Sequence, residues 1–251
     1  MRERGYIVRP EHFLRYLRKD LHLSPSQTRL PRRAVHVFGG DEFRAVRRAL
    51  RGTRSAWSRW VAIGRADRVP AVVFRSHIGA PASSMDLEEM GVLGVREVIA
   101  FGSCGSIVKD LRIGDFVVPD FAVSDEGTSR HYGAPRRPAP DPGLRATILA
   151  ACARSGLAIR EGGVWTTDAP YREHRDRASS LAKRGVIAVD MEAAALWTVA
   201  RHREMRVASI FVVSDELGGP GWNPGFHHER HVEGLQRAAR LVVDILARHG
   251  G

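Results

Sequence analysis

The residues that could carry chemistry in this sequence follow short apolar runs. Ser103 follows "EVIAFG", Asp190 follows "VIAV", and Asp215 follows "IFVVS". Two further runs end similarly, one before Asp168 and one before the glycines of "VFGGDEFR", which lead to Arg44. A glycine-rich turn with an arginine and a serine suits an oxyanion, because N–H groups and a guanidinium can point at its negative charge. Carboxylic side chains beside it can accept hydrogen bonds or move a proton.

Each of these features also has a purely structural explanation. The glycines of "GSCGS" could form only a tight turn between a strand and a helix, and an aspartate at such a boundary is a good helix N-cap. Glu192 could complement the dipole of the alanine-rich helix that it opens. Met191 could be a core residue, and Arg44 could be a solvated helix residue. Taken singly, the residues leave both explanations open.

These side chains need strands and helices to position them, and the apolar pattern predicts both in alternation. Short runs rich in β-branched residues predict strands at 34–38, 69–76, 97–101, 114–119, 163–168, 185–190 and 207–215. Helical periodicity predicts helices at 11–19, 42–51, 85–93, 144–155, 175–184, 193–202 and 231–248. Proline and glycine predict loops at 131–143 and 218–225.

This alternation favours an α/β fold: a single domain with a mixed, mainly parallel central sheet and helices on both faces. Residues 1–33 are dense in charge and are interpreted as an N-terminal extension to a domain over 34–251. In such sheets ligands bind at the carboxyl ends of the strands, so the polar strand ends are expected to meet in one site.

Composition narrows the class of protein. A net charge of +11 comes almost wholly from arginine, with three lysines in the chain, and the basic residues are scattered among acids. This distribution does not favour nucleic-acid binding, although it would attract anionic substrates. No apolar stretch is long enough to span a membrane. Two cysteines make no disulfide framework, so a cytoplasmic protein is expected.

Four segments together resemble the nucleoside phosphorylase-I family, which includes the hexameric purine nucleoside and uridine phosphorylases. "GSCGSI", "AVDMEAAAL" and "VVSDEL" are similar to its most diagnostic segments. "GGDEFR" looks like the family's Gly-Asp-Pro-x-Arg phosphate turn, with Glu42 in place of proline. The resemblance covers roughly residues 34–217, with a weaker match in the last helix. It implies a phosphorylase-like three-layer domain and a dimer-based homo-oligomer such as a hexamer.

The resemblance also implies a phosphate site, a ribose site, a base site and two catalytic residues. The expected residues are, for phosphate, Gly40, Arg44 and Ser103; for ribose, Met191 and Glu192; for the base, Cys104, Gly105, Tyr171, Asp190 and Ser214; and for catalysis, Asp215 as proton donor with Arg230 as its partner.

The implied activity is reversible phosphorolysis of a nucleoside N-glycosidic bond, giving free base and pentose 1-phosphate. Its partners are a nucleoside and inorganic phosphate as co-substrate, without a cofactor. In the transition state the sugar becomes cationic and the base anionic, so an anion below the sugar and a proton donor at the base both stabilise it. His227, His228 and His231 cluster without accompanying ligands in a metal-binding pattern, so no metal site is expected.

Two departures from the family pattern leave the nucleophile and the base open. Many family members carry an arginine three residues before the serine of the glycine segment, where this chain has Ala100. Arg54, Arg59 or Arg75 could replace it, or the enzyme could be a nucleosidase that uses water. An aspartate at position 215 is the purine-type choice, so purine is preferred over uridine, although "TTDAPYRE" resembles a branch often grouped with uridine phosphorylases.

Overall fold

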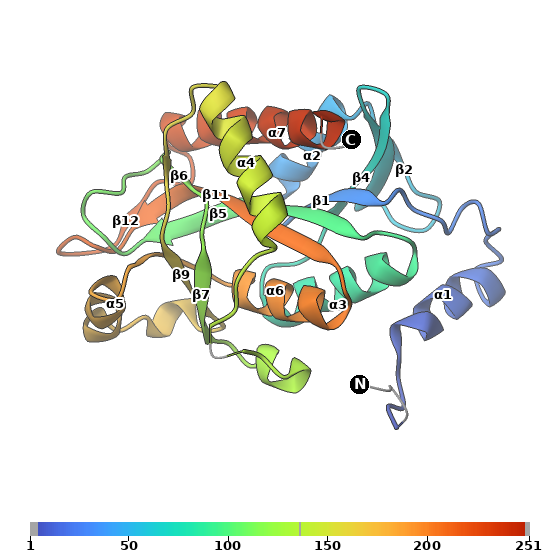
Figure 1. Cartoon of the computed structure of the whole chain (residues 1–251), viewed down its shortest axis with the longest axis horizontal. Helices are drawn as coiled ribbons and strands as arrows, with labels where there is room; N and C mark the ends of the chain where they lie inside the picture. The colour runs from blue at the N-terminus through green and yellow to red at the C-terminus, as the bar shows by residue number, and fades with distance from the viewer. Residues whose placement is uncertain (1–4, 136, 249–251) are drawn as a thin grey trace.

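The strands expected from apolar runs form one mixed sheet in the computed structural model of the chain, which describes residues 5–135 and 137–248 (Figure 1). The strands are β1 (Arg33–Val37), β2 (Thr53–Arg54), β3 (Val61–Ala66), β4 (Val69–Arg75), β5 (Glu97–Ser106), β6 (Phe116–Val117), β7 (Phe121–Asp125), β8 (Ile159–Arg160), β9 (Gly163–Thr167), β10 (Val186–Asp190), β11 (Arg206–Glu216) and β12 (Asn223–Pro224). The main path through the sheet runs β2-β3-β4-β1-β5-β10-β9-β7, and β11 pairs with β5.

The central strands β4, β1, β5 and β11 run parallel to one another, while β3 and β10 are antiparallel to β4 and β5. The helices are α1 (Pro10–Lys19), α2 (Gly40–Ala49), α3 (Ala80–Val92), α4 (Pro142–Arg154), α5 (Arg175–Ala182), α6 (Ala193–His202) and α7 (Glu229–Arg248). Short 3-10 turns cover Ser129–Tyr132 and Pro170–Arg172. The predicted mixed, mainly parallel α/β fold is confirmed.

Helices cover both faces of the sheet, as strands without a polar face require. On one face α2, α4 and α7 bury side chains such as Phe43, Leu144 and Leu241. On the other face α3 and α6 bury Leu87 and Leu196 against the strands. Figure 1 shows these two groups of helices above and below the sheet. Helix α1 packs on α3 and buries Leu17 in the same core cluster.

The segment "GSCGS" differs from the turn that its glycines suggest. Strand β5 continues through it to Ser106. A Cβ atom on Gly102 would lie 2.7 Å from Cδ2 of Phe38, and one on Gly105 would lie 2.7 Å from Cδ1 of Leu217. Both glycines therefore allow side chains to pack closely against an extended strand, most tightly the Phe38 ring at Gly102, and neither marks a change of chain direction.

Because β5 is extended here, it stays paired with β11 along its whole length. Ser103 lies level with Val212, and a bulge after Val213 brings Asp215 opposite Gly105. The pairing of the two longest strands of the described chain thus brings the predicted phosphate-binding and proton-donating segments to one edge of the sheet.

Some strands were not predicted from the sequence. Strand β3 contains Gly64 and the exposed Arg65, and strand β7 is partly exposed towards Asp125, so neither shows a continuous apolar run. The two-residue strand β12 lies within the loop predicted at 218–225 and pairs with the end of β11. Helix α6 has the bounds that the sequence predicts.

We predict that Gly102→Ala destabilises the protein, because a methyl group at this position collides with the ring of Phe38. Overpacking of this kind lowers the free energy of unfolding by about 1–3 kcal/mol, which urea denaturation measures. Gly221→Ala is the matched control, since a Cβ atom there meets no atom within 4 Å, and it should change stability by less than about 0.5 kcal/mol. Equal stability of both variants would contradict this account of the strand.

Candidate active site

A cavity of about 1320 Å³ opens over the carboxyl ends of β5, β10 and β11, between α2 and the start of α7. Most of the residues expected from the sequence line it: Arg44, Ser103, Cys104, Gly105, Tyr171, Asp190, Met191, Glu192, Ser214 and Asp215. Of the residues that the structure describes, the expected Gly40 and Arg230 do not line it. Ten of the expected residues, from five separate segments of the chain, therefore line the same cavity.

The first corner of the cavity is the start of α2. Gly40 is the first residue of the helix, between Gly39 and Asp41, which both line the cavity. The Glu42 side chain folds back over Gly39, and its carboxylate accepts a hydrogen bond from its own backbone N–H. Burial raises the pKa of Glu42 above its ordinary value. The Arg44 guanidinium, in turn, forms an ion pair with the exposed Asp41.

Ala100, which stands where many family members carry an arginine, lies in the core. Ala100 is fully buried in the cluster beneath α3 and α6, level with His36 on β1. Arg75 reaches the α2 corner instead: its Nε donates to the Phe38 carbonyl at 3.2 Å, and its cation acts on the carboxylate of Glu42. Among the three arginines considered from the sequence, Arg75 thus has direct contacts with this corner.

The second corner is formed by Ser103 on β5. Its Oγ atom lies 3.0 Å from Nε2 of His231, which is at the start of α7. The other ring nitrogen of His231, Nδ1, lies 3.0 Å from the carbonyl oxygen of Phe226. His231 is 3% exposed, and burial lowers its pKa below the ordinary value.

The third corner is the junction of β10 and α6. Both carboxylate oxygens of Asp190 accept hydrogen bonds from the chain: Oδ1 from the Thr166 hydroxyl at 2.6 Å, and Oδ2 from the N–H groups of Glu192 and Ala193 at 3.1 and 2.6 Å. Burial raises the pKa of Asp190 to about 6, and these donors act against that rise. Asp190 therefore satisfies backbone N–H groups at the start of α6 as well as lining the cavity.

Glu192 points from the same junction towards the loop before α3. Its Oε1 atom accepts a hydrogen bond of 2.6 Å from the N–H of Gly79. Gly79 has a φ of +110°, which favours glycine. Burial, followed by the charge of Asp190, raises the pKa of Glu192 to about 8. The cavity therefore holds a carboxyl group that takes up a proton near neutral pH.

The fourth corner is the end of β11. Asp215 accepts a hydrogen bond of 2.7 Å from the Ser214 hydroxyl and one of 2.8 Å from the indole N–H of Trp222. Ser214 also lies within hydrogen-bond distance of the Cys104 carbonyl, at 3.2 Å. Glu173 lines the cavity nearby, and burial together with the charge of Asp215 raises its pKa to about 7.

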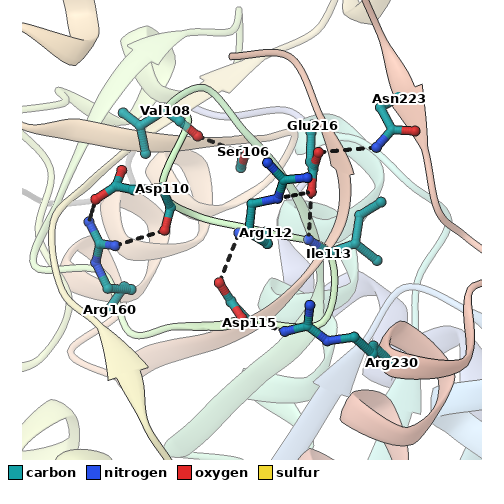
Figure 2. A network of polar contacts seen from close by, with 10 residues as sticks. All are labelled: Ser106, Val108, Asp110, Arg112, Ile113, Asp115, Arg160, Glu216, Asn223 and Arg230. Atoms are coloured by element: carbon teal, nitrogen blue, oxygen red, sulfur yellow. Dashed lines mark hydrogen bonds and ion pairs between the residues drawn. The ribbon is translucent and has the colours of Figure 1, made fainter. Parts of the chain in front are cut away.

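Arg230 does not pair with Asp215 in the structure. Its Nη2 atom lies 3.1 Å from Oδ1 of Asp115, within a polar network that also joins Arg112 to Glu216 at 3.0 Å (Figure 2). Asp115 and Arg112 lie on the loop between β5 and β6, whereas Glu216 is the last residue of β11. In the structure Asp215 has Ser214 and Trp222 as its hydrogen-bond donors, and Arg230 ties the start of α7 to the loop between β5 and β6. A catalytic role for Arg230 stays a prediction.

Aromatic side chains surround the mouth of the cavity. Tyr171 is 98% exposed and Trp222 is 61% exposed, although both line the opening. Cys104, by contrast, is 3% exposed, and burial raises the pKa of its thiol well above the ordinary value. Cys104 therefore lines the floor as a neutral, weakly polar group.

Sequence reasoning did not place His231, Trp222 and Glu173 in the site. In the sequence His231 is one member of a histidine cluster, and its contact with Ser103 joins residues 128 positions apart. Trp222 lies in a glycine- and proline-rich loop without periodicity. A tryptophan in such a loop, without a core to fill, is the one signal that could have indicated it.

Neither a metal site nor a membrane span was found in the described part of the chain. Over residues 5–135 and 137–248, no three side chains of His, Cys, Asp or Glu are grouped so that they could hold a metal ion. No helix in these ranges is both long and apolar enough to cross a bilayer.

The chain is similar to known proteins over most of its length. Residues 37–247 match the family model of the phosphorylase superfamily. The chain is 29% identical to a guanosine phosphorylase of Halorubrum lacusprofundi over 186 residues, which cover 72% of this chain and 77% of the relative. It is 34% identical to a DeoD-type purine nucleoside phosphorylase of Bacillus cereus over 143 residues, which cover 56% of this chain and 61% of that relative.

A likeness to a solved structure concerns the fold alone. The crystal structure of purine nucleoside phosphorylase from Toxoplasma gondii in complex with immucillin-H superposes with a TM-score of 0.79 at 20% sequence identity. The match covers 90% of this chain and 93% of that one. The three-layer arrangement is therefore the one seen in a phosphorylase.

The raised pKa of Glu192 predicts a pH dependence of stability. The folded pKa is about 8, whereas a free glutamate has a pKa of about 4.3, so the folded state holds a proton that the unfolded chain releases. Stability is therefore lost as the pH rises from about 4.5 to about 8. Glu192→Gln keeps an oxygen for the Gly79 N–H and removes the titration.

Urea denaturation at pH about 8 should show Glu192→Gln more stable than the wild type by about 1–3 kcal/mol, with a smaller difference at pH about 5. Glu233→Gln, at an exposed position of α7, is the control and should follow the wild-type pH profile. A Glu192→Gln profile parallel to that of the wild type would show that Glu192 is ionised normally in the fold.

Proposed function

The chain belongs to the phosphorylase superfamily, and on that premise we propose that it is a purine nucleoside phosphorylase. It is an enzyme of the pentosyltransferase class, as the sequence predicts. In the proposed reaction inorganic phosphate attacks C1′ of a purine nucleoside and releases free base and pentose 1-phosphate. The observation that carries the proposal is that Arg44 and Ser103 line the same cavity as Asp215, with Glu192 on its wall.

The arrangement suits a reaction that develops opposite charges at two places. Phosphate held by Arg44, Ser103 and the start of α2 would lie below the sugar and stabilise its positive charge. Asp215, held by two donors, would give a proton or a hydrogen bond to the base as it becomes anionic. Met191 and Glu192 would contact the ribose between them. Glu192 suits this role, because a buried carboxyl group discriminates a hydroxyl partner from an apolar one.

Several features support a purine as the base. Asp215 can protonate N7 of a purine, an atom that a pyrimidine lacks. The relatives named above are a guanosine phosphorylase and purine nucleoside phosphorylases. The aromatic rings of Tyr171 and Trp222 at the mouth offer stacking surface for a two-ring base. The base site in this proposal is completed by Cys104, Gly105, Ser214 and Asp190.

The setting of the enzyme is also a proposal. A dimer-based homo-oligomer in the cytoplasm is supported by family membership and by two buried cysteines that form no disulfide. Ile78 and Met85, both exposed large apolar side chains, lie near the start of α3 and would be covered in such an assembly. Light scattering on the purified chain would measure its mass in solution.

Hydrolysis is the second candidate, and one specific observation favours it. The carboxylate of Glu42 occupies the α2 corner, where a phosphate would otherwise find N–H groups, and Asp41 holds Arg44. A buried carboxylate beside the sugar could accept a proton from an attacking water. The presence of Arg44 on the cavity wall supports phosphorolysis as the better candidate.

We predict that guanosine or inosine releases its base only when phosphate is present. Asp215→Asn keeps the shape and one of the two acceptor oxygens but removes the proton donor, so turnover should fall by about 100- to 10,000-fold. Spectrophotometric detection of free base measures both effects. Asp110→Asn, which alters a surface pair with Arg160, should keep wild-type turnover. Base release without phosphate would move the proposal to hydrolysis, and full activity of Asp215→Asn would remove Asp215 from the reaction.

We predict opposite effects of Glu42→Gln under the two candidates. In a phosphorylase the change removes a negative charge beside the anion, so the KM for phosphate should fall by at least about tenfold. In a hydrolase it removes the base that activates water, so phosphate-independent turnover should fall. Kinetics over a range of phosphate concentrations measure both. An unchanged KM together with unchanged turnover would show that Glu42 takes no part in either reaction.

A further inference from the structure

The direction of the hydrogen bond between Ser103 and His231 follows from the second contact of the imidazole ring. A carbonyl oxygen only accepts, so the bond of 3.0 Å to Phe226 requires a hydrogen on Nδ1. Neutral imidazole carries one N–H, so Nε2 is then an acceptor. The Ser103 hydroxyl must therefore donate its single hydrogen to His231, over 3.0 Å.

This direction is unfavourable for an anion. With its hydrogen committed to His231, the Ser103 hydroxyl presents only lone pairs to the cavity, and lone pairs repel phosphate oxygens. Ser103 can donate to an anion without leaving a buried partner unsatisfied only if His231 carries a second proton. Nε2–H then donates to Ser103 Oγ, and the hydroxyl hydrogen becomes free to turn towards the cavity.

We propose that His231 is a positioning residue that takes up a proton when an anion binds, and thereby converts Ser103 from a donor to His231 into a donor to the anion. The proposal deepens the proposed function and rests on it, since it concerns the same phosphate site. The proton added to Nε2 comes from solvent or from the anion itself, and no covalent bond other than N–H is formed.

The charges around His231 favour such a switch. Burial chiefly lowers the pKa of His231, with a small contribution from His227, while the hydrogen bond to Phe226 and the carboxylate of Asp215 act in the opposite direction. Arg44 and Asp41 line the same cavity from α2 and hold each other as a pair. A dianion in this space adds negative charge near a buried imidazole, so the protonated form becomes the stable one.

Protonation of His231 also compensates for the positive charge that is absent at Ala100 in β5. A protonated His231 supplies one positive charge next to Ser103, whereas Ala100 supplies none and is buried in the core. The charge exists only while the anion is bound, which avoids an unpaired buried cation in the empty site.

The experiment measures proton uptake on binding of sulfate, which has the shape of phosphate but does not titrate near neutral pH. Calorimetry at pH about 7 in two buffers of different ionisation enthalpy should show about 0.5–1 proton taken up per sulfate by the wild type. The affinity for sulfate should fall with rising pH between about 6 and 9, by up to about tenfold per unit.

Two variants assign the proton. Glutamine at position 231 has an amide N–H that can donate to Ser103 at any pH, so His231→Gln should bind sulfate with no proton uptake and a flat pH profile. His228→Gln is the matched control, because His228 is exposed and does not line the cavity, and it should retain the wild-type uptake. Circular dichroism and thermal melting check that both variants are folded.

Several results would overturn the proposal: no proton uptake by the wild type, equal uptake by His231→Gln, loss of uptake in His228→Gln, or no binding of sulfate at all. These outcomes are separate from the failure of the proposed function. A wild type that binds sulfate with proton uptake but releases no base from nucleosides would keep the role of His231 and refute the phosphorylase. A wild type that is an active phosphorylase without proton uptake would keep the phosphorylase and refute the role of His231.

Discussion

The parallel pairing of β5 with β11 is the constraint on which the site depends. It extends through "GSCGS" because Gly102 and Gly105 leave room for Phe38 and Leu217. The two strands therefore end together, and the polar groups that follow their apolar cores lie across one cavity from each other. A side chain at either glycine would separate the strands or displace their neighbours, so the packing of the core and the geometry of the site have one cause.

The cavity concentrates carboxyl groups whose ionisation is costly. Burial raises the pKa values of Asp190, Glu192 and Glu173 to about 6, 8 and 7. Asp190 is held by three donors, whereas Glu192 accepts one N–H at its Oε1, and both residues line the cavity. Groups with perturbed pKa values gathered in one cavity are typical of active sites. Buried carboxyl groups of this kind lower the free energy of unfolding. Active sites commonly carry such destabilising groups because ligand binding needs them.

The sequence alone predicted the fold and the convergence of strand ends, because apolar periodicity and the order of strands and helices determine which segments are buried. The bounds of α6 are an example. The alanine-rich run indicates a helix, and the preceding Asp190 indicates where that helix begins. Pairings between distant side chains were beyond such reasoning. Arg230 turns to Asp115 and His231 turns to Ser103, although they are adjacent in the sequence. Helical geometry points neighbours in different directions, and only the packed neighbours decide which partner each one meets.

The most direct measurement is a crystal structure of the protein with inorganic phosphate and guanine. Phosphate should lie between Ser103 and Arg44, and the purine ring should lie with N7 next to Asp215. The ribose-sized space between them should be bounded by Glu192. Phosphate or guanine bound elsewhere on the molecule, with this cavity empty, would contradict the assignment of the cavity as the active site.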